Sequence, residues 1–574
     1  MKIKVSDYLA AFLKEQGVTH VFELVGGMIT FLIDSIHTGG GIKIVSVHHE
    51  QGAAFAAEGY GRATGVPGVA LATSGPGATN LLTGIGSCYF DSTPAVFITG
   101  QVNRHEMKGD LPIRQLGFQE TDIVSMAKPI TKAAWQATDP AQIPDLLRRA
   151  FALALDGRPG PVLVDIPLDV QRAEIEVEAP VKAPAPAIEI HQGLDAFATD
   201  LLAGLRSAER PLILAGGGIR VSGTHEAFLR FVERAGVPVV HSLMGVDLLP
   251  YASPHRFGMI GSYGNRYANH AISRSDFLVV LGSRLDVRQT GADTASFKSE
   301  RTIYHLDCEA GELNNRVKGC VTHTASLRDF FAAVERLAPA KATPSTKWLA
   351  ELDALKLQSP DDREYSGANL NPNRLMHQLS AVSSAAAGFV ADVGQHQMWA
   401  AQSLRLGAGQ RFLTSGGMGS MGFSLPAAIG FAFGAGKPAV VIAGDGGFQC
   451  NIQELQTVAR NGLPLKLVIL NNQCHGMVRQ FQESYFKGRY ASTLWGYDTP
   501  DFVAVGNAYG IPSRLLAEEG DAEAALAWLW EDPAGPALLE VAIESHGNVY
   551  PKMAFGRPIH EMEPFVKPTE MEGT

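Results

Sequence analysis

The sequence predicts an α/β protein with parallel sheets flanked by helices. Apolar runs of strand length alternate with helix-like stretches through most of the 574 residues, and this alternation is typical of parallel sheets. A chain of this length is too long for a single hydrophobic core. Two Pro-containing stretches, at 178–190 and 338–347, separate three blocks. We therefore expect three domains, at 1–180, 191–340 and 360–555.

Each block supplies its own strand candidates, which are short runs rich in Val, Ile and Leu that end at glycine or polar residues. Those of the first block lie at 18–25, 42–48, 68–74, 95–100 and 162–167, with a helix-like stretch at 50–63. Those of the middle block lie at 211–218, 237–242, 276–283 and 301–307. Those of the last block lie at 388–394, 438–447, 465–472 and 536–542.

The composition excludes several classes of function. Hydrophobic residues make up 46% and charged residues 18% of the chain, as in ordinary globular proteins. A net charge of −10 without a basic run argues against nucleic acid or a membrane surface as a main partner. The five cysteines lack CxxC spacing and indicate neither a zinc site nor a disulfide framework. The N-terminus lacks the apolar core of a signal peptide and no apolar run reaches the length of a membrane span, so we expect a cytoplasmic protein.

The most informative pattern lies at 444–473. The run PAVVIA leads into GDGG and the run LKLVIL leads into NNQC, so Asp445 and Asn472 each follow a strand that could neighbour the other. A hard cation such as Mg²⁺ binds oxygen ligands and keeps diphosphate oxygens in its shell. Asp445 offers a carboxylate, Asn472 an amide carbonyl and the NNQC turn a backbone carbonyl. Glycines next to the aspartate would let backbone N–H groups approach phosphate, and they are Gly444, Gly446 and Gly447. For GDG alone an ordinary acidic turn is the better interpretation, but GDG with NN at this spacing is more specific.

Other candidate residues each have a structural alternative. Glu50 begins a helix, where a carboxylate also favours the helix dipole and can act as a cap. The Gly-rich turns at 74–85 and 414–430 are either tight strand-to-helix connections or places where amides approach a cofactor, and Met421 is an apolar residue at the tip of the second turn.

The middle block has two glycine-containing loops after strands. ILAGGG is a weak indication of phosphate binding by itself. The loop GSRLDVRQTG at 282–291 adds Arg284, Asp286 and Arg288, which could form a solvated ion-pair loop or could hold a dinucleotide or a substrate carboxylate.

Together these residues resemble the acetolactate synthase family of thiamine-diphosphate enzymes, and the resemblance covers almost the whole chain. The ordered motifs are HEQGAAFAAEGYGRA, SGPGATN, GFQET, GRPGPVLVDIP, RLDVRQTG, MGFSLPAAIG, GDGGFQCNIQEL and LNNQCHGMVRQF. The resemblance implies an N-terminal pyrimidine-binding domain at 1–180, a central domain at 191–340 and a C-terminal diphosphate-binding domain at 360–555. Because the two cofactor-binding domains of one site come from different subunits in this family, it also implies at least a homodimer.

The resemblance assigns roles to the candidate residues. Glu50 would activate the aminopyrimidine ring, whose imino nitrogen removes the C2 proton. Asp445, Asn472 and the backbone carbonyl of Cys474 would bind Mg²⁺. The remaining assignments are the carbonyl of Gly419 for the cofactor amino group, Met421 as the wedge that bends the cofactor, Gln119 in the reaction site, and Gly26, Thr73, Asn80, His475, Gly476 and Met477 around the cofactor.

Many enzymes of this family also hold FAD in the central domain. The matching positions are Arg158, Gly216, Gly217, Gly218, Gly282, Arg284, Asp286 and Arg288. We therefore expect FAD as a third cofactor.

The chain departs from biosynthetic acetolactate synthases near the substrate. Those enzymes usually carry Lys at the position of Leu168, Trp at the position of Phe481, RHE in place of HHE at 48–50, and RFDDRVTG in place of RLDVRQTG. The substrate pocket implied by the resemblance comprises Phe118, Leu168, Arg288, Met477 and Phe481. The changes at 168 and 481 put the second substrate in doubt and leave the cofactor chemistry intact.

These observations predict a carboligase that decarboxylates a 2-oxo acid, with pyruvate expected, and joins the remainder to a second carbonyl. The acceptor could be a 2-oxo acid, a ketone, a diketone or a keto-sugar. The alternatives are a flavin oxidase resembling pyruvate oxidase, a simple 2-oxo acid decarboxylase and a non-enzymatic nucleotide-binding protein. The presence of Glu50 together with Asp445 and Asn472 argues against the last, because a pure binding protein does not need an activating carboxylate.

Overall fold

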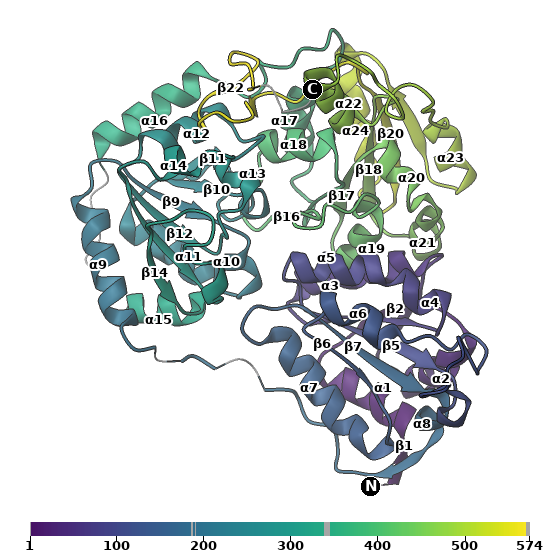
Figure 1. The fold of residues 1–574 in the computed structure, drawn as a ribbon. Coiled ribbons are helices and arrows are strands. Elements are labelled where there is room, and N and C mark those ends of the chain that lie inside the picture. Colours follow the sequence, from purple (N-terminus) through teal and green to yellow (C-terminus); the bar gives the residue numbers. More distant parts are fainter. Residues whose placement is uncertain (1, 185–186, 190, 338–344, 570–574) are drawn as a thin grey trace.

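The computed structural model describes residues 2–184, 187–189, 191–337 and 345–569, and it contains three six-stranded parallel sheets, one in each expected block (Figure 1). Residue 1 of the first expected domain, residues 185, 186 and 190 of the first Pro-containing stretch, and residues 338–344 at the second stretch lie outside the described residues, as do 570–574. No helix of the described part of the chain is both long and apolar enough to cross a membrane.

The first and third sheets have the same strand order. The first runs β3-β2-β4-β5-β7-β6 and the third runs β16-β15-β17-β18-β20-β19, so both follow the order 2-1-3-4-6-5 when strands are counted along each block. The first sheet comprises β2 (His20–Leu24), β3 (Lys43–Ser46), β4 (Gly68–Ala72), β5 (Ala95–Gln101), β6 (Ala133–Gln136) and β7 (Pro161–Pro167). The third comprises β15 (Gly388–Ala391), β16 (Arg411–Leu413), β17 (Ala439–Gly444), β18 (Leu465–Asn471), β19 (Ser513–Leu516) and β20 (Ala537–Ala542).

The middle sheet has a different order, β11-β10-β9-β12-β13-β14, which is 3-2-1-4-5-6 along the block. Its strands are β9 (Pro211–Ala215), β10 (Val239–His241), β11 (Arg256–Met259), β12 (Phe277–Leu281), β13 (Thr302–Asp307) and β14 (Val321–Thr324). In open parallel sheets, ligands bind beyond the carboxyl ends of the strands at the point where the strand order reverses. That point lies between β9 and β12 in the middle sheet, between β2 and β4 in the first and between β15 and β17 in the third.

Helices cover both faces of each sheet, so alternate residues of a strand enter two different cores. In β4, Val69 and Leu71 pack into one apolar cluster, and Ala70 and Ala72 pack into another. The covering helices of the first block include α1 (Val5–Glu15), α2 (Thr30–Gly39), α3 (Glu50–Thr64), α5 (Leu82–Phe90) and α7 (Ile143–Leu155). Those of the middle block include α9 (Leu194–Ser207), α11 (His225–Ala235), α12 (Arg266–Arg274), α15 (Leu327–Leu337) and α16 (Thr346–Gln358). Those of the last block include α17 (Pro372–Val382), α18 (Gln395–Ser403), α19 (Ser424–Ala435), α21 (Leu455–Asn461), α22 (Gly476–Tyr485), α23 (Phe502–Ala508) and α24 (Ala522–Leu529).

The first and last blocks meet through α3 and α19, which lie against each other between the two sheets (Figure 1). Glycines allow this close approach. A Cβ on Gly59 would overlap the carbonyl oxygen of Ala427, and a Cβ on Gly430 would overlap that of Ala56. The backbones of the two helices are therefore in direct contact.

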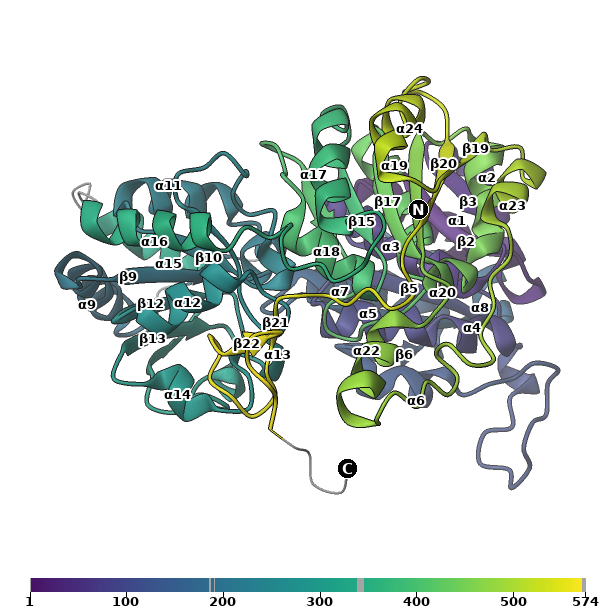
Figure 2. The ribbon, with the colours of Figure 1, turned by 90° about the horizontal axis from the view of Figure 1, so that it is seen from above.

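The C-terminal segment returns from the last block to the middle block (Figure 2). It forms the short antiparallel pair β21 (Lys552–Met553) and β22 (Met562–Glu563). The backbone N–H of Met553 donates to the carbonyl of Ser262 at 2.7 Å. This segment joins the two blocks beside α22.

Candidate active site

The two residues expected to bind a cation lie at the ends of neighbouring strands. β17 and β18 pair in parallel, with Gly444 opposite Leu470. Asp445 directly follows β17, and Asn472 follows the last residue of β18. The sequence-based expectation that the two strands could be neighbours is confirmed. Asp445 is also the first residue of α20 (Asp445–Gln449), at the switch point between β15 and β17.

The Asp445 carboxylate is buried with one oxygen left unsatisfied. Its Oδ1 accepts a hydrogen bond from the Gly446 N–H at 2.8 Å, whereas Oδ2 is buried and has no partner. Burial raises the pKa of this carboxyl to about 7, against the opposing effect of nearby backbone N–H groups and the Tyr497 hydroxyl. A buried carboxylate oxygen without a donor is costly unless a cation pairs with it. The donor set around Asp445 therefore fits a hard divalent cation.

The turn after β18 is held by hydrogen bonds of the Asn472 side chain. Asn472 Nδ2 donates to Gln395 Oε1 at 3.0 Å, and its Oδ1 accepts from the Cys474 N–H at 3.2 Å. Gln473 between them has a φ of 53°, so the turn is tight. Helix α22 starts at Gly476 next to His475 and Met477, and a Cβ on Gly476 would overlap Gln395 Oε1. The N-terminus of α22 is thus packed directly against the Asn472 turn, and its first N–H, that of Gly476, donates to the Cys474 carbonyl at 2.9 Å.

Three buried side chains of this region were missed in the sequence analysis. His396 in α18 lies against Gly444, and its Nε2 is buried without a partner. Burial lowers the pKa of His396 to about 4, so its ring is neutral. Asp392 accepts hydrogen bonds from the Gly422 and Ser424 N–H groups at 2.9 and 2.8 Å and thereby holds the start of α19. The third residue is Gln395. The segment DVGQHQ directly follows the strand at 388–391, but none of its residues was named as a candidate site residue from the sequence.

The loop that carries Gly419 and Met421 is held from the first block. Gly416 and Gly417 donate their N–H groups to the Asp91 carboxylate at 3.0 and 2.6 Å. Arg62 of α3 in turn contacts Asp91 at 2.8 Å and donates to the carbonyl of Thr414. Gly419 has a φ of 72°, and the Met421 side chain is partly exposed at the tip of the loop.

Glu50 does not cap its helix. The cap of α3 is the side chain of His49, whose Nδ1 accepts from the Gln51 N–H at 3.0 Å. The Glu50 carboxylate is buried, and its Oε2 accepts from Asn80 Nδ2 at 2.9 Å. Its other oxygen faces Gly77 in the SGPG turn. The Glu50 side chain is therefore not the cap of α3, although its carboxylate lies in the first turn of the helix, where it favours the helix dipole.

The remaining candidates of the first block gather at the carboxyl end of its sheet. Gly26 follows β2 and packs against Thr73, which follows β4, so the two lie at the switch point of this sheet. Gln119 has a φ of 65° and lies beside Gly75. Phe118 next to it is 79% exposed, and such a surface position is unusual for a large apolar ring. Two further candidates were expected in the substrate pocket. Leu168 is the first residue of α8 (Leu168–Arg172) and is partly buried, and Phe481 lies in α22 and is partly exposed.

A cavity of about 1460 Å³ lies at the switch point of the middle sheet and is lined by residues of all three blocks. The loops after β9 and β12 pack tightly there, because a Cβ on Gly216 or Gly218 would overlap Gly282. Gly217 lies in the same loop and lines the cavity. The strand order and the position of the cavity are those of dinucleotide-binding sheets.

Two arginines at this cavity lie close to carboxylates. Arg158 contacts Glu309 at 2.7 Å and Glu312 at 3.2 Å, and Arg284 lies 3.7 Å from Glu312. Asp286 caps α13 (Val287–Thr290) by accepting from the Arg288 N–H at 2.8 Å. Asp286 therefore shapes the loop. The Arg288 backbone carbonyl accepts from the Ser262 N–H at 2.6 Å, and the Arg288 side chain lines the cavity.

Family comparisons agree with this architecture. Residues 3–126 match the family model for the N-terminal TPP binding domain of thiamine pyrophosphate enzymes, residues 198–334 match the central domain, and residues 392–541 match the C-terminal TPP binding domain. The chain belongs to the thiamine pyrophosphate enzyme family. Each matched segment lies within one of the three blocks.

Among curated proteins, the relatives of this thiamine pyrophosphate enzyme include acetolactate synthases. The acetolactate synthase large subunit of Lactococcus lactis is 38% identical over 97% of this chain and 95% of its own length. The large subunit of acetolactate synthase isozyme 2 of Escherichia coli is 37% identical over 97% and 98%. Chloroplastic acetolactate synthase 2 of Nicotiana tabacum is 36% identical over 96% and 84%. The chain is therefore a thiamine-diphosphate-dependent enzyme of the acetolactate synthase-like type.

Proposed function

We propose that this enzyme is a Mg²⁺-dependent carboligase that decarboxylates pyruvate and joins the remaining two-carbon unit to a second carbonyl compound. The observation that carries the proposal is a pair of buried carboxylates. Glu50 is buried and does not cap its helix, and Asp445 has a buried oxygen without a hydrogen-bond donor. A protein that merely bound a nucleotide would need neither arrangement.

The cation would be held by the Asp445 carboxylate, the Asn472 amide oxygen and the backbone carbonyl of Cys474. When bound, thiamine diphosphate would supply a nucleophilic carbon for attack on the 2-oxo acid and an acceptor for the electron pair that remains when CO₂ leaves. Glu50 would hold the proton on the pyrimidine ring, positioned by Asn80 at 2.9 Å. The Gly419 carbonyl would orient the cofactor amino group, and Met421 would support its bent shape.

We also propose a homodimer in which each active site uses two chains. The pyrimidine-side residues gather at the first sheet and the diphosphate-side residues gather at the third. Apolar side chains are exposed at both groups, with Val25 62%, Phe118 79% and Met421 38% exposed. Contact with a second copy would cover these surfaces and bring Glu50 of one chain to the cation site of the other.

FAD would occupy the cavity at the switch point of the middle sheet. The strand order 3-2-1-4-5-6 and the packed glycines at its switch point support a dinucleotide. Purified protein should be yellow or should take up FAD on reconstitution, as followed by its visible absorption. A protein that stays colourless with excess FAD would contradict this assignment.

The acceptor is proposed to be a carbonyl compound without a carboxylate. At position 168 the chain has Leu in place of the Lys of related synthases, so a cation that would attract an anionic acceptor is missing. At position 481 it has Phe, which lies 4.8 Å from Tyr485 and 5.9 Å from Phe486, ring centre to ring centre. These three rings form an apolar surface on α22 that favours an uncharged acceptor.

The experiment is a competition between pyruvate and an uncharged diketone at equal concentrations, with products identified by mass spectrometry. We expect the mixed product to be a major component in the wild type. Phe481→Trp should shift the ratio toward acetolactate by about 5- to 150-fold, because a change of pocket shape of this size is worth ~1–3 kcal/mol. Acetolactate as the sole wild-type product would contradict the proposed acceptor. Peroxide formation in place of a coupled product would indicate an oxidase, and acetaldehyde alone would indicate a decarboxylase.

A further inference from the structure

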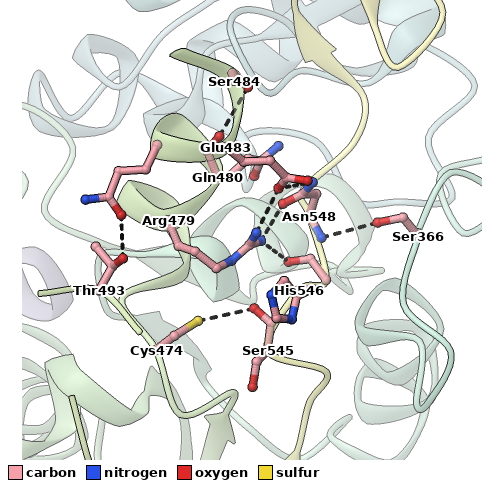
Figure 3. Close-up of polar contacts among 12 residues, drawn as sticks. Ser366, Cys474, Arg479, Gln480, Glu483, Ser484, Thr493, Ser545, His546 and Asn548 are labelled. Carbon is pink, nitrogen blue, oxygen red and sulfur yellow. Dashed lines mark hydrogen bonds and ion pairs between the residues drawn. The ribbon is translucent and has the colours of Figure 1, made fainter. Parts of the chain in front are cut away.

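A buried arginine ties α22 to the chain segment after β20. The Arg479 side chain is fully buried, and its Nη1 donates to Glu483 Oε2 at 2.8 Å (Figure 3). Its Nη2 donates to the carbonyl of Gly547 at 3.1 Å and also to Asn548 Oδ1. Asn548 Nδ2 completes the ring by donating to Glu483 Oε2 at 3.0 Å. The Gly547 carbonyl is thus held in place by a charge-assisted hydrogen bond.

The same carbonyl is linked to Asn472 through the side chain of Gln395. Gln395 Nε2 donates to the Gly547 carbonyl at 3.0 Å, and Gln395 Oε1 accepts from Asn472 Nδ2 at 3.0 Å. Gln395 and Asn472 are both buried, so water does not compete for these hydrogen bonds. A continuous line of hydrogen bonds therefore runs from Arg479 through Gly547 and Gln395 to Asn472.

The direction of these hydrogen bonds follows from the acceptors that Gln395 Nε2 meets, which are the Gly547 carbonyl at 3.0 Å and Gln480 Oε1 at 3.5 Å. A backbone carbonyl can accept hydrogen bonds but cannot donate them. Gln395 must therefore turn its NH₂ group toward Gly547, which leaves its oxygen toward Asn472. Asn472 must then turn its own NH₂ group toward Gln395, which leaves its Oδ1 on the side of Cys474. A hard cation binds an amide oxygen and is repelled by an NH₂ group, so this orientation is the one that a cation site needs.

Anchoring of the helix alone does not account for the arginine. Gln480 next to it already ties α22 to the same segment, because it donates to the Val549 carbonyl at 3.0 Å and accepts from the Val549 N–H at 3.1 Å. A fully buried guanidinium is expensive in free energy. We attribute its presence to the hydrogen bond that fixes the position of the Gly547 carbonyl.

We propose that Arg479 is a positioning residue for the cation site, and that it acts through the Gly547 carbonyl and Gln395 to fix which atom of the Asn472 amide faces the cation. This inference rests on the proposed function, because it takes Asn472 as a cation ligand. In this network Arg479 is linked to Asn472 through Gly547 and Gln395. Its loss should therefore weaken cation binding first and slow the reaction as a consequence.

The test measures Mn²⁺ binding by electron paramagnetic resonance in the presence of thiamine diphosphate. Arg479→Met should raise the Mn²⁺ dissociation constant about 10- to 100-fold, the range found when partners of metal ligands are removed. Arg479→Lys should lose less, because an ammonium group can still donate to the Gly547 carbonyl but lacks the second arm of the fork. Ser484→Ala is the matched control, since the Ser484 hydroxyl donates to the Gln480 carbonyl of the same helix at 3.1 Å and stands apart from the network (Figure 3).

A double variant separates this route from a general weakening of the structure. If Arg479 acts through Gln395, the double variant Gln395→Met/Arg479→Met should bind Mn²⁺ no more weakly than Gln395→Met alone. Saturating Mn²⁺ should restore thiamine diphosphate binding to Arg479→Met. Additive losses in the double variant, or no recovery at saturating Mn²⁺, would overturn the positioning role.

The outcomes also distinguish the inference from the proposed function. A wild-type protein that binds no Mn²⁺ with thiamine diphosphate would refute the cation site and the inference together. A wild-type protein that binds Mn²⁺, with Arg479→Met equal to it, would refute the inference alone. If Arg479→Met does not fold, Arg479→Lys is compared with the wild type and the Ser484→Ala control by the same titration, and equal affinity in all three would contradict the proposal.

Discussion

Glu50 shows how the surroundings of a residue determine what it can do. A glutamate at the first position of a helix has an ordinary use as a cap. In this protein His49 supplies that cap, and Asn80 holds the Glu50 carboxylate inside the protein at 2.9 Å. Burial and the hydrogen bond from Asn80 therefore fix the position of the carboxylate to which we assign the proton transfer.

Glu50→Gln should leave thiamine diphosphate bound but slow exchange of its C2 proton about 10²- to 10⁴-fold, the usual contribution of a general acid–base group. Hydrogen–deuterium exchange of the bound cofactor, followed by NMR, measures this rate directly. Glu454→Gln is the control, because Glu454 is another buried carboxylate near the start of α3 that accepts from the His48 N–H at 3.0 Å. Equal exchange rates in Glu50→Gln and wild type would show that the assignment is wrong.

The elements that hold the first and last blocks of one chain together are α3 and α19. Glu50 is the first residue of α3, and α19 begins just after the loop that carries Met421. The backbones of the two helices touch at Gly59 and Gly430. The distance between the two sheets is therefore set by residues that have no side chain. A longer side chain at either glycine would push the first and last blocks apart.

Gly430→Ala should lower the free energy of unfolding by about 1–3 kcal/mol, the usual cost of overpacking. The sign is informative, because the same change in an unconstrained helix stabilises a protein by up to ~1 kcal/mol. Gly39→Ala at the end of α2 is the control, since its Cβ would lie 3.8 Å from the nearest atom, Ala10 Cβ. Denaturant unfolding of the cofactor-free proteins measures both. Stabilisation by Gly430→Ala would mean that the helices are further apart than described.

At the scale of the whole molecule, the proposed dimer predicts complementation between inactive variants. Glu50→Gln loses the pyrimidine side of the site, and Asp445→Ala loses the cation side. In a mixed dimer with shared sites, one site carries both changes and the other carries neither. Random mixing should then restore about a quarter of the wild-type activity, because half of the dimers are mixed and each has one intact site. Unfolding and refolding the two variants together provides the mixture.

Each variant refolded alone is the control for this experiment and should stay inactive. If each chain instead builds its own complete site, the mixture will also stay inactive, which would contradict shared sites. The assay therefore decides between the two architectures without a structure of the dimer.

The sequence by itself determined the three blocks, the α/β class and most of the inner strands. Long apolar runs such as 438–444 and 465–471 are buried on both faces of a sheet, so they are conspicuous in the sequence. Within the three six-stranded sheets of the described residues, the strands without a corresponding run are β6, β11, β14, β16 and β19, and all five lie at sheet edges. An edge strand has a neighbour on one side only and is often short and partly polar, so its sequence carries less of this signal.

The same distinction holds for the site. Asp445 and Asn472 could be found from the sequence, because each directly follows a conspicuous inner strand. Gln395, His396 and Arg479 could not be assigned in that way, since their significance depends on contacts with Asn472, Gly444 and Gly547, which lie far away along the chain. Spacing along a strand or helix records which residues are local neighbours. Which atom of an amide faces a cation is decided by hydrogen bonds between distant segments, and those exist only in the folded protein.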